Sequence, residues 1–122
     1  MKKILIVDDE RPVREMVKKF LTRRGYEVVD CADAQEACRL VSEQAPAVVL
    51  LDIRLPQTDG IEVLKKIREI NKDVGVIIVS AVSEPALVDE CKRLGAFDYI
   101  TKPIKLDTLE ESVLAKFFEF YK

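Results

Sequence analysis

The chain has 122 residues, of which 34% are charged and 48% hydrophobic, and its formal net charge is −2. This length and composition indicate a single globular domain over residues 1–122, large enough to bury a core without disulfides. The acidic balance argues against a basic surface for nucleic acid or anionic lipid, and no apolar stretch is long enough for a signal peptide or membrane span, so a cytoplasmic protein is expected.

Apolar runs and helical periodicity predict five strands, each followed by a helix. Short runs rich in β-branched residues are typical of strands buried on both faces of a parallel sheet. Strands are expected over residues 4–7, 26–29, 47–51, 76–79 and 97–100.

The first two helices have clear limits. Apolar residues at helical spacing begin at Val13, and Gly25 ends the first helix. Asp33 followed by Glu36 resembles a capping box and predicts a second helix that runs to about Gln44.

The last three helices have predicted caps at Asp59, Ser83 and Asp107, and Glu follows each aspartate three residues later. The fourth helix is expected to stop at Gly95. One face of the third helix is predicted to consist of Ile61, Leu64, Ile67 and Ile70.

This alternation predicts an α/β fold, with a doubly wound, five-stranded parallel sheet and helices on both faces. Five strands suit the flavodoxin-like order 2-1-3-4-5, which places the switch point between the first and third strands. The order is inferred at the level of the fold, because the sequence determines only the alternation.

Polar residues come just after four of the predicted strands: Asp8 and Asp9, Asp52, Ser80, and Lys102. They should meet at one edge of the sheet, where ligands bind in such folds and where adjacent strands lie about 5 Å apart. Three carboxylates there require a cation, and oxygen ligands with an open side suit Mg²⁺ holding a phosphoryl oxygen. A carboxylate can itself be the nucleophile and form an aspartyl phosphate.

Other chemistry is limited by the absence of histidine from the chain. No Ser-His-Asp or Cys-His site can form, and a zinc site would lack its usual nitrogen ligand. Cys31, Cys38 and Cys91 form no Cys-x-x-Cys motif and are interpreted as free thiols.

The chain resembles, over essentially its whole length, the receiver domain of two-component response regulators, of the chemotaxis-regulator type. Each motif is weak alone, but four in the correct order are specific. They are Asp8-Asp9-Glu10, Asp52 with Pro56 and Asp59-Gly60, Ser80-Ala81, and Tyr99-Ile100-Thr101-Lys102-Pro103.

The resemblance implies that Asp52 accepts a phosphoryl group from a phosphohistidine of a sensor histidine kinase or phosphotransfer protein. Asp8 and Asp9 would bind Mg²⁺ together with Asp52, and the backbone carbonyl of Arg54 would be a further ligand. Such a domain catalyses only its own phosphorylation and dephosphorylation and is not otherwise an enzyme.

The resemblance also assigns the remaining rim residues. Lys102 would pair with the acyl phosphate, and the Lys102–Pro103 bond would be cis. Ser80 would be the switch hydroxyl and Tyr99 the aromatic switch residue. Departures from commoner family members at Gln57-Thr58 and Val82-Ser83 affect only loop shape and access to the site.

Three other functions compete with this one. A Mg²⁺-dependent phosphohydrolase of the dehalogenase-like class would need an acid at position 54, where the chain has arginine. A flavodoxin-like FMN carrier would need a hydroxyl- and glycine-rich loop in place of Asp8-Asp9-Glu10. A receiver-like protein that works without phosphorylation would not need its intact set of rim residues. Helix capping is a simpler explanation for Asp9 alone.

Partners follow from the leading interpretation. We expect a kinase or phosphotransfer protein upstream and a target protein or output domain downstream, with no direct contact to nucleic acid or membrane. Four aromatic residues lie at the end of the chain: Phe117, Phe118, Phe120 and Tyr121. This aromatic end favours a homodimer or domain contact through the last helix.

Overall fold

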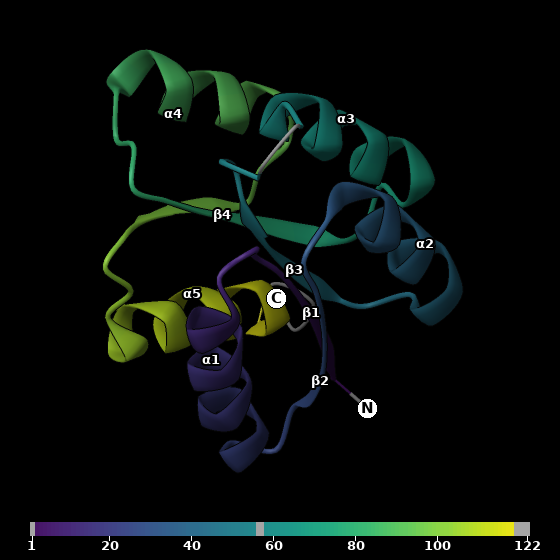
Figure 1. Ribbon diagram of the computed structural model, residues 1–122, viewed down its shortest axis with the longest axis vertical. Helices are drawn as coiled ribbons and strands as arrows, with labels where there is room; N and C mark the ends of the chain where they lie inside the picture. Colours follow the sequence, from purple (N-terminus) through teal and green to yellow (C-terminus); the bar gives the residue numbers. More distant parts are fainter. Residues whose placement is uncertain (1, 56–57, 119–122) are drawn as a thin grey trace.

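The computed structural model describes residues 2–55 and 58–118, and within them five parallel strands form one sheet in the order β2-β1-β3-β4-β5 (Figure 1). The predicted strand order is therefore confirmed. The strands are β1 (Lys3–Val7), β2 (Glu27–Cys31), β3 (Val48–Asp52), β4 (Gly75–Ser80) and β5 (Asp98–Thr101).

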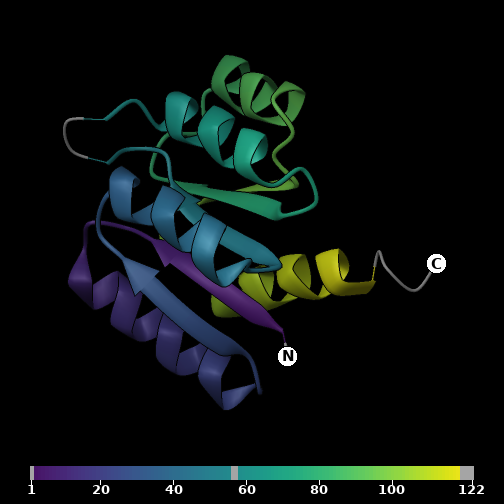
Figure 2. The same ribbon diagram turned by 90° about the vertical axis from the view of Figure 1, so that its right-hand side faces the viewer.

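Helices cover both faces of this sheet, as predicted, with α1 and α5 on one side and α2, α3 and α4 on the other (Figures 1 and 2). None of the helices in the described part of the chain is long and apolar enough to span a membrane. The helices are α1 (Arg11–Arg23), α2 (Ala34–Gln44), α3 (Gly60–Ile70), α4 (Pro85–Arg93) and α5 (Leu106–Phe118).

Two apolar layers hold the sheet between the helices. Along β1, Leu5 and Val7 pack under α2 and α3, whereas Ile4 and Ile6 pack against α1 and α5. The strands β3 and β4 alternate in the same way, because successive side chains of a strand point to opposite faces. Both faces are buried, which explains why these strands are continuous apolar runs.

Two of the helix starts differ from the predicted caps. Asp33 caps α2 as expected, accepting a hydrogen bond of 2.8 Å from the Glu36 amide. The predicted cap at Ser83 is wrong, since Glu84 is the N-cap and Pro85, whose fixed φ suits the first turn, begins α4. Asp107 lies inside the first turn of α5 and not before it.

Asp59 is the N-cap of α3, as predicted, and accepts a hydrogen bond from the Ile61 amide. Gly60 is required behind it, because a Cβ there would lie 2.1 Å from the carbonyl oxygen of Ile53. The predicted apolar face of α3 was partly wrong. Ile70 is 43% exposed, and Val63 is buried in its place.

The places of Tyr26 and Phe117 in the fold also differ from those predicted. The amide of Tyr26 donates to the Leu21 carbonyl at the end of α1, so β2 begins one residue later than predicted. The Tyr26 ring stacks on Phe117, with 5.5 Å between the ring centroids. Phe117 is therefore part of the core and offers no exposed contact surface.

The side chain of Phe118, together with Phe120 and Tyr121, lies outside the described residues, as do Pro56 and Gln57 of the loop after β3.

Candidate functional site

The strand register brings the predicted site residues to one edge of the sheet. Val7 is paired with Leu51, so Asp8 emerges beside the end of β3, where Asp52 is the last residue. Ser80 ends β4 and is paired with Thr101, the residue before Lys102. The polar residues that follow the strands are therefore neighbours in space, as predicted.

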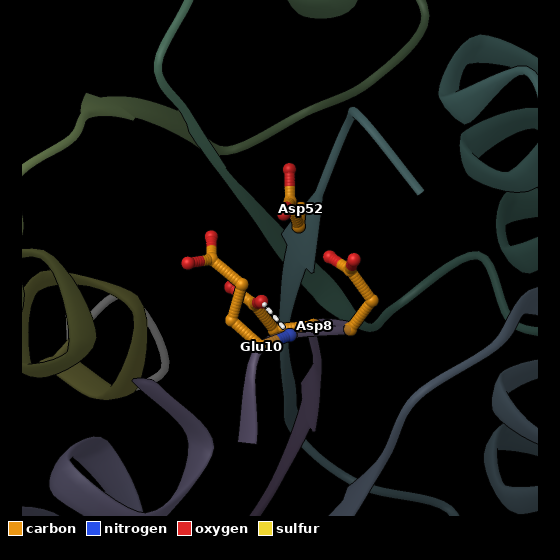
Figure 3. A group of neighbouring side chains, drawn as sticks. Asp8, Glu10 and Asp52 are labelled. Atoms are coloured by element: carbon orange, nitrogen blue, oxygen red, sulfur yellow. Dashed lines mark hydrogen bonds between the residues drawn. The ribbon is translucent and has the colours of Figure 1, made fainter. Parts of the chain in front are cut away.

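Four carboxylates form the centre of this edge, and Figure 3 shows three of them, Asp8, Glu10 and Asp52, grouped around the ends of β1 and β3. Together with Asp9, each offers an oxygen within 4.8 Å of the others. Asp8 and Asp52 are buried, whereas Asp9 and Glu10 are exposed. Glu10 thus joins the predicted acids.

The ammonium of Lys102 lies among these acids. Its Nζ is 3.0 Å from Asp8 Oδ2, 3.0 Å from Glu10 Oε1 and 3.1 Å from Asp52 Oδ2. Burial disfavours the charged form of Lys102, but the hydrogen bonds that its ammonium donates to the three carboxylates outweigh this effect and raise the pKa of the lysine. The lysine therefore stays charged and acts as the internal counter-ion of the cluster.

Asp8 is held by its neighbours on every side. Its amide donates to the Cys31 carbonyl, and its Oδ1 accepts a hydrogen bond of 2.8 Å from the Glu10 amide. Burial raises the pKa of Asp8 above its usual value, although the bonds from Glu10 and Lys102 oppose this effect. Such a carboxylate gains from a nearby cation.

Asp9 and Asp52 are not helix caps. The N-cap of α1 is Glu10, and α3 begins well beyond Asp52. The Oδ1 atom of Asp52 instead accepts a hydrogen bond of 2.9 Å from the Arg54 amide, while Oδ2 binds Lys102. The Arg54 side chain is exposed.

Ser80 and Tyr99 lie beside the acids and are linked through one residue, Val82. The buried Ser80 Oγ accepts a hydrogen bond of 3.0 Å from the Val82 amide. The Tyr99 hydroxyl donates to the carbonyl of the same residue. Burial raises the pKa of Tyr99, so the phenol stays protonated and able to donate.

The Lys102–Pro103 peptide bond is cis, as the resemblance predicted. The amide of Lys102 donates to the Ser80 carbonyl at 2.7 Å. The loop after β5 is thereby attached to the end of β4.

The donor set is suited to Mg²⁺, because carboxylate oxygens with an open side are the ligands this ion prefers. The position of the Lys102 ammonium supports this conclusion, since a positive charge already lies among the same oxygens. One contributor was not found from the sequence. Arg14 of α1 donates a hydrogen bond of 2.8 Å to the Asp8 carbonyl, and a contact to a main-chain atom leaves no signal in the residue pattern.

The chain is similar to several curated proteins. The chain is 36% identical over 111 residues to sporulation initiation phosphotransferase F of Bacillus subtilis, covering 91% of this chain and 90% of that protein. It is 35% identical to chemotaxis protein CheY of Thermotoga maritima, covering 92% and 94% of the two chains. It matches only 23% of the length of Escherichia coli regulatory protein AtoC, at 41% identity.

The chain is also similar in fold to solved structures. The chemotaxis protein CheY4 of Vibrio cholerae superposes with a TM-score of 0.88 at 30% identity, covering 94% of this chain and 98% of that one. A CheY solved in a complex of CheX, CheY, BeF₃ and Mg²⁺ from Borrelia burgdorferi gives a TM-score of 0.89 at 32% identity, covering 95% and 89%. The model of the response regulator receiver domain matches residues 4–114.

These findings do not favour a phosphohydrolase or an FMN carrier. Receiver domains bind Mg²⁺ in an acidic pocket and act as phosphoacceptors in signalling, in contact with kinases or phosphotransfer proteins and output domains. The chain belongs to the response regulator receiver domains of two-component signal transduction.

Proposed function

We propose that Asp52 accepts the phosphoryl group and that Asp8, Asp9 and Asp52, with the backbone carbonyl of Arg54, hold Mg²⁺. One observation carries the proposal. The buried Asp52 carboxylate accepts a hydrogen bond from the Arg54 amide through one oxygen and pairs with the Lys102 ammonium through the other, so it is fixed in place beside a positive charge. When bound, Mg²⁺ neutralises negative charge that develops on the phosphoryl oxygens.

The transfer step follows from this arrangement. An oxygen of Asp52 attacks the phosphorus of the donor phosphohistidine, so a P–O bond forms as the P–N bond breaks, and the imidazole leaves. Lys102 lies 3.1 Å from Asp52 and donates to the oxygens of the transferred group. The chain catalyses its own phosphorylation in this way and needs no histidine.

The signal leaves the site through Ser80 and Tyr99. A phosphoryl oxygen on Asp52 attracts the Ser80 hydroxyl, which then loses its bond to the Val82 amide. Tyr99 binds the carbonyl of the same residue, so it moves with that segment. The change reaches the face formed by α4, β5 and α5, where a target protein or output domain binds.

The upstream partner is a sensor histidine kinase or phosphotransfer protein. An open, largely apolar pocket of about 500 Å³ adjoins Lys102 and is suited to protein contact. Its lining includes Val13, Met16, Pro103 and Ile104. A homodimer through α5 and a cytoplasmic location stay predictions.

Chemical phosphorylation tests the assignment. Incubation with acetyl phosphate and Mg²⁺ should add one phosphoryl group to the wild-type chain, detected by intact-mass spectrometry, and none to Asp52→Ala. Asp73→Asn, an exposed acid at the opposite end of the sheet, is the matched control and should be modified normally. Equal modification of Asp52→Ala, or modification that persists in EDTA, would refute the proposal.

A further inference from the structure

Arg14 connects α1 to the ends of two strands. Its Nη1 donates to the carbonyl oxygen of Asp8 at 2.8 Å, and its Nε lies 3.1 Å from Asp30 Oδ2 on β2. The Arg14 side chain is 16% exposed and that of Asp30 is 27% exposed. Lys18, one turn later on α1, also reaches Asp30, at 3.2 Å from Oδ1.

Arg14 completes the set of bonds that fixes Asp8. The Asp8 amide donates to Cys31, the carboxylate binds the Glu10 amide and Lys102, and the carbonyl binds Arg14. The Asp8 carbonyl lies in the same rigid plane as the amide of Asp9, because the peptide bond is planar. A guanidinium that holds the carbonyl therefore sets the rotation of the peptide leading into Asp9.

Asp9 depends on this support more than the other acids do. It is exposed, and within residues 2–55 and 58–118 its carboxylate makes no hydrogen bond. Its oxygen nevertheless lies within 4.8 Å of those of Asp8 and Asp52. The direction of its main chain is what keeps it there.

We propose that Arg14, anchored by Asp30, is a positioning residue for the cation site and aims the Asp9 carboxylate at it. The inference rests on the metal site proposed above. Groups that orient metal ligands typically contribute about 10- to 100-fold to metal affinity. Because Arg14 acts through a single main-chain bond, a loss of about tenfold in Mg²⁺ affinity is expected when it is removed.

Because Arg14 is positively charged, the direction of the change in Mg²⁺ affinity on its removal distinguishes a positioning role from a purely electrostatic one. If the guanidinium acted only as a nearby positive charge, its removal would strengthen Mg²⁺ binding, since like charges repel. If it positions Asp9, its removal weakens binding. A role in stability alone predicts neither change once the variant is folded.

Mg²⁺ titration followed by backbone amide chemical shifts distinguishes these cases. Arg14→Met should bind Mg²⁺ about tenfold more weakly than wild type. Arg14→Lys retains the charge but lacks the fork that reaches both Asp8 and Asp30, so it should bind nearly as weakly. Lys18→Met is the matched control, because it removes a positive charge from the same Asp30 without a bond to Asp8, and its affinity should equal or exceed that of wild type.

Urea denaturation in EDTA verifies that each variant is folded. If Arg14→Met does not fold, Arg14→Lys is the variant used for the comparison. Unchanged or stronger Mg²⁺ binding by folded Arg14 variants would overturn the inference and leave the proposed site intact. Equal weakening by Lys18→Met would overturn it as well, because the effect would then follow from Asp30 alone. Failure of the wild-type chain to bind Mg²⁺ would instead refute the proposed function.

Discussion

The two halves of the functional edge are built in different ways. At the ends of β1 and β3, Asp8, Asp52 and Lys102 are joined by charge-assisted bonds of 3.0–3.1 Å, and both acids also accept backbone amide bonds. On the β4 and β5 side, Ser80 at the end of β4 and Tyr99 within β5 are neutral and bind the main chain of one residue, Val82.

This difference assigns a separate task to each half. The charged half is assembled before any ligand arrives, so little reorganisation is needed for chemistry. The neutral half rests on two hydrogen bonds to a single peptide segment, so exchanging one of them releases the segment. Under the function proposed above, the charged half is the rigid reaction centre and the neutral half is the part that moves.

The strongest test of the charged half is Lys102→Met. Removing the ammonium leaves buried Asp8 and Asp52 without their shared counter-ion, so we expect a loss of about 3 kcal/mol in the free energy of unfolding in EDTA. Mg²⁺ should restore much of this loss, because it supplies the missing charge. Urea denaturation with and without Mg²⁺ measures both effects, with exposed Lys105→Met as the control. An unchanged midpoint in EDTA would contradict this account.

The neutral half is tested by Ser80→Ala. The variant should still accept beryllofluoride at Asp52 but lose most of the coupling to the α4–β5–α5 face, about tenfold in partner affinity. Amide chemical shifts of Tyr99 and its neighbours report the loss, and exposed Ser83→Ala should respond as wild type does. Wild-type shifts that stay confined to the metal site on activation would rule out the switch.

The boundary between the halves should set the lifetime of the phosphorylated state. Arg54 follows Asp52 by two residues and Val82 follows Ser80 by two, so both side chains are placed to limit in-line approach of water. The double variant Arg54→Asn, Val82→Glu opens this approach and supplies a polar group, so dephosphorylation should be several-fold faster. A decay rate equal to that of wild type, followed by intact mass, would mean that these side chains do not gate water.

The smallest effect on stability is expected for Asp9→Asn. Asp9 is exposed beside other carboxylates, and relief of like-charge repulsion should make the metal-free protein slightly more stable, by no more than about 0.5 kcal/mol. The additional stability gained on adding Mg²⁺ should fall sharply. Thermal unfolding in EDTA measures the stability of the metal-free protein, and thermal unfolding in Mg²⁺ measures the gain on metal binding. A marked loss of stability in EDTA would assign Asp9 a structural role.

Much of this molecule could be predicted from its sequence because its strands are simple. Apolar runs that end abruptly in Asp8-Asp9, Asp52 and Ser80 define both the sheet and the edge where ligands bind. The helix limits were harder, since Pro85 rather than Ser83 determines where α4 begins.

Other features were out of reach because they depend on main-chain atoms. The bond from Arg14 to the Asp8 carbonyl and the link from Tyr99 to the Val82 carbonyl involve an acceptor that every residue carries. The place of Glu10 in the acid cluster depends on the turn made by Asp8. Such contacts form only in the folded chain.

Lys102 has a consequence for how this domain responds to its surroundings. Its ammonium contacts the same carboxylate oxygens that a divalent cation would bind, so the two compete. Because the lysine is part of the chain, its effective concentration at the site is constant. The apparent affinity for Mg²⁺ is then the intrinsic affinity reduced by the fraction of time that the oxygens are free. The Mg²⁺ occupancy of the proposed site is therefore set by competition between two cations, the Lys102 ammonium, which is attached to the chain, and the free metal ion.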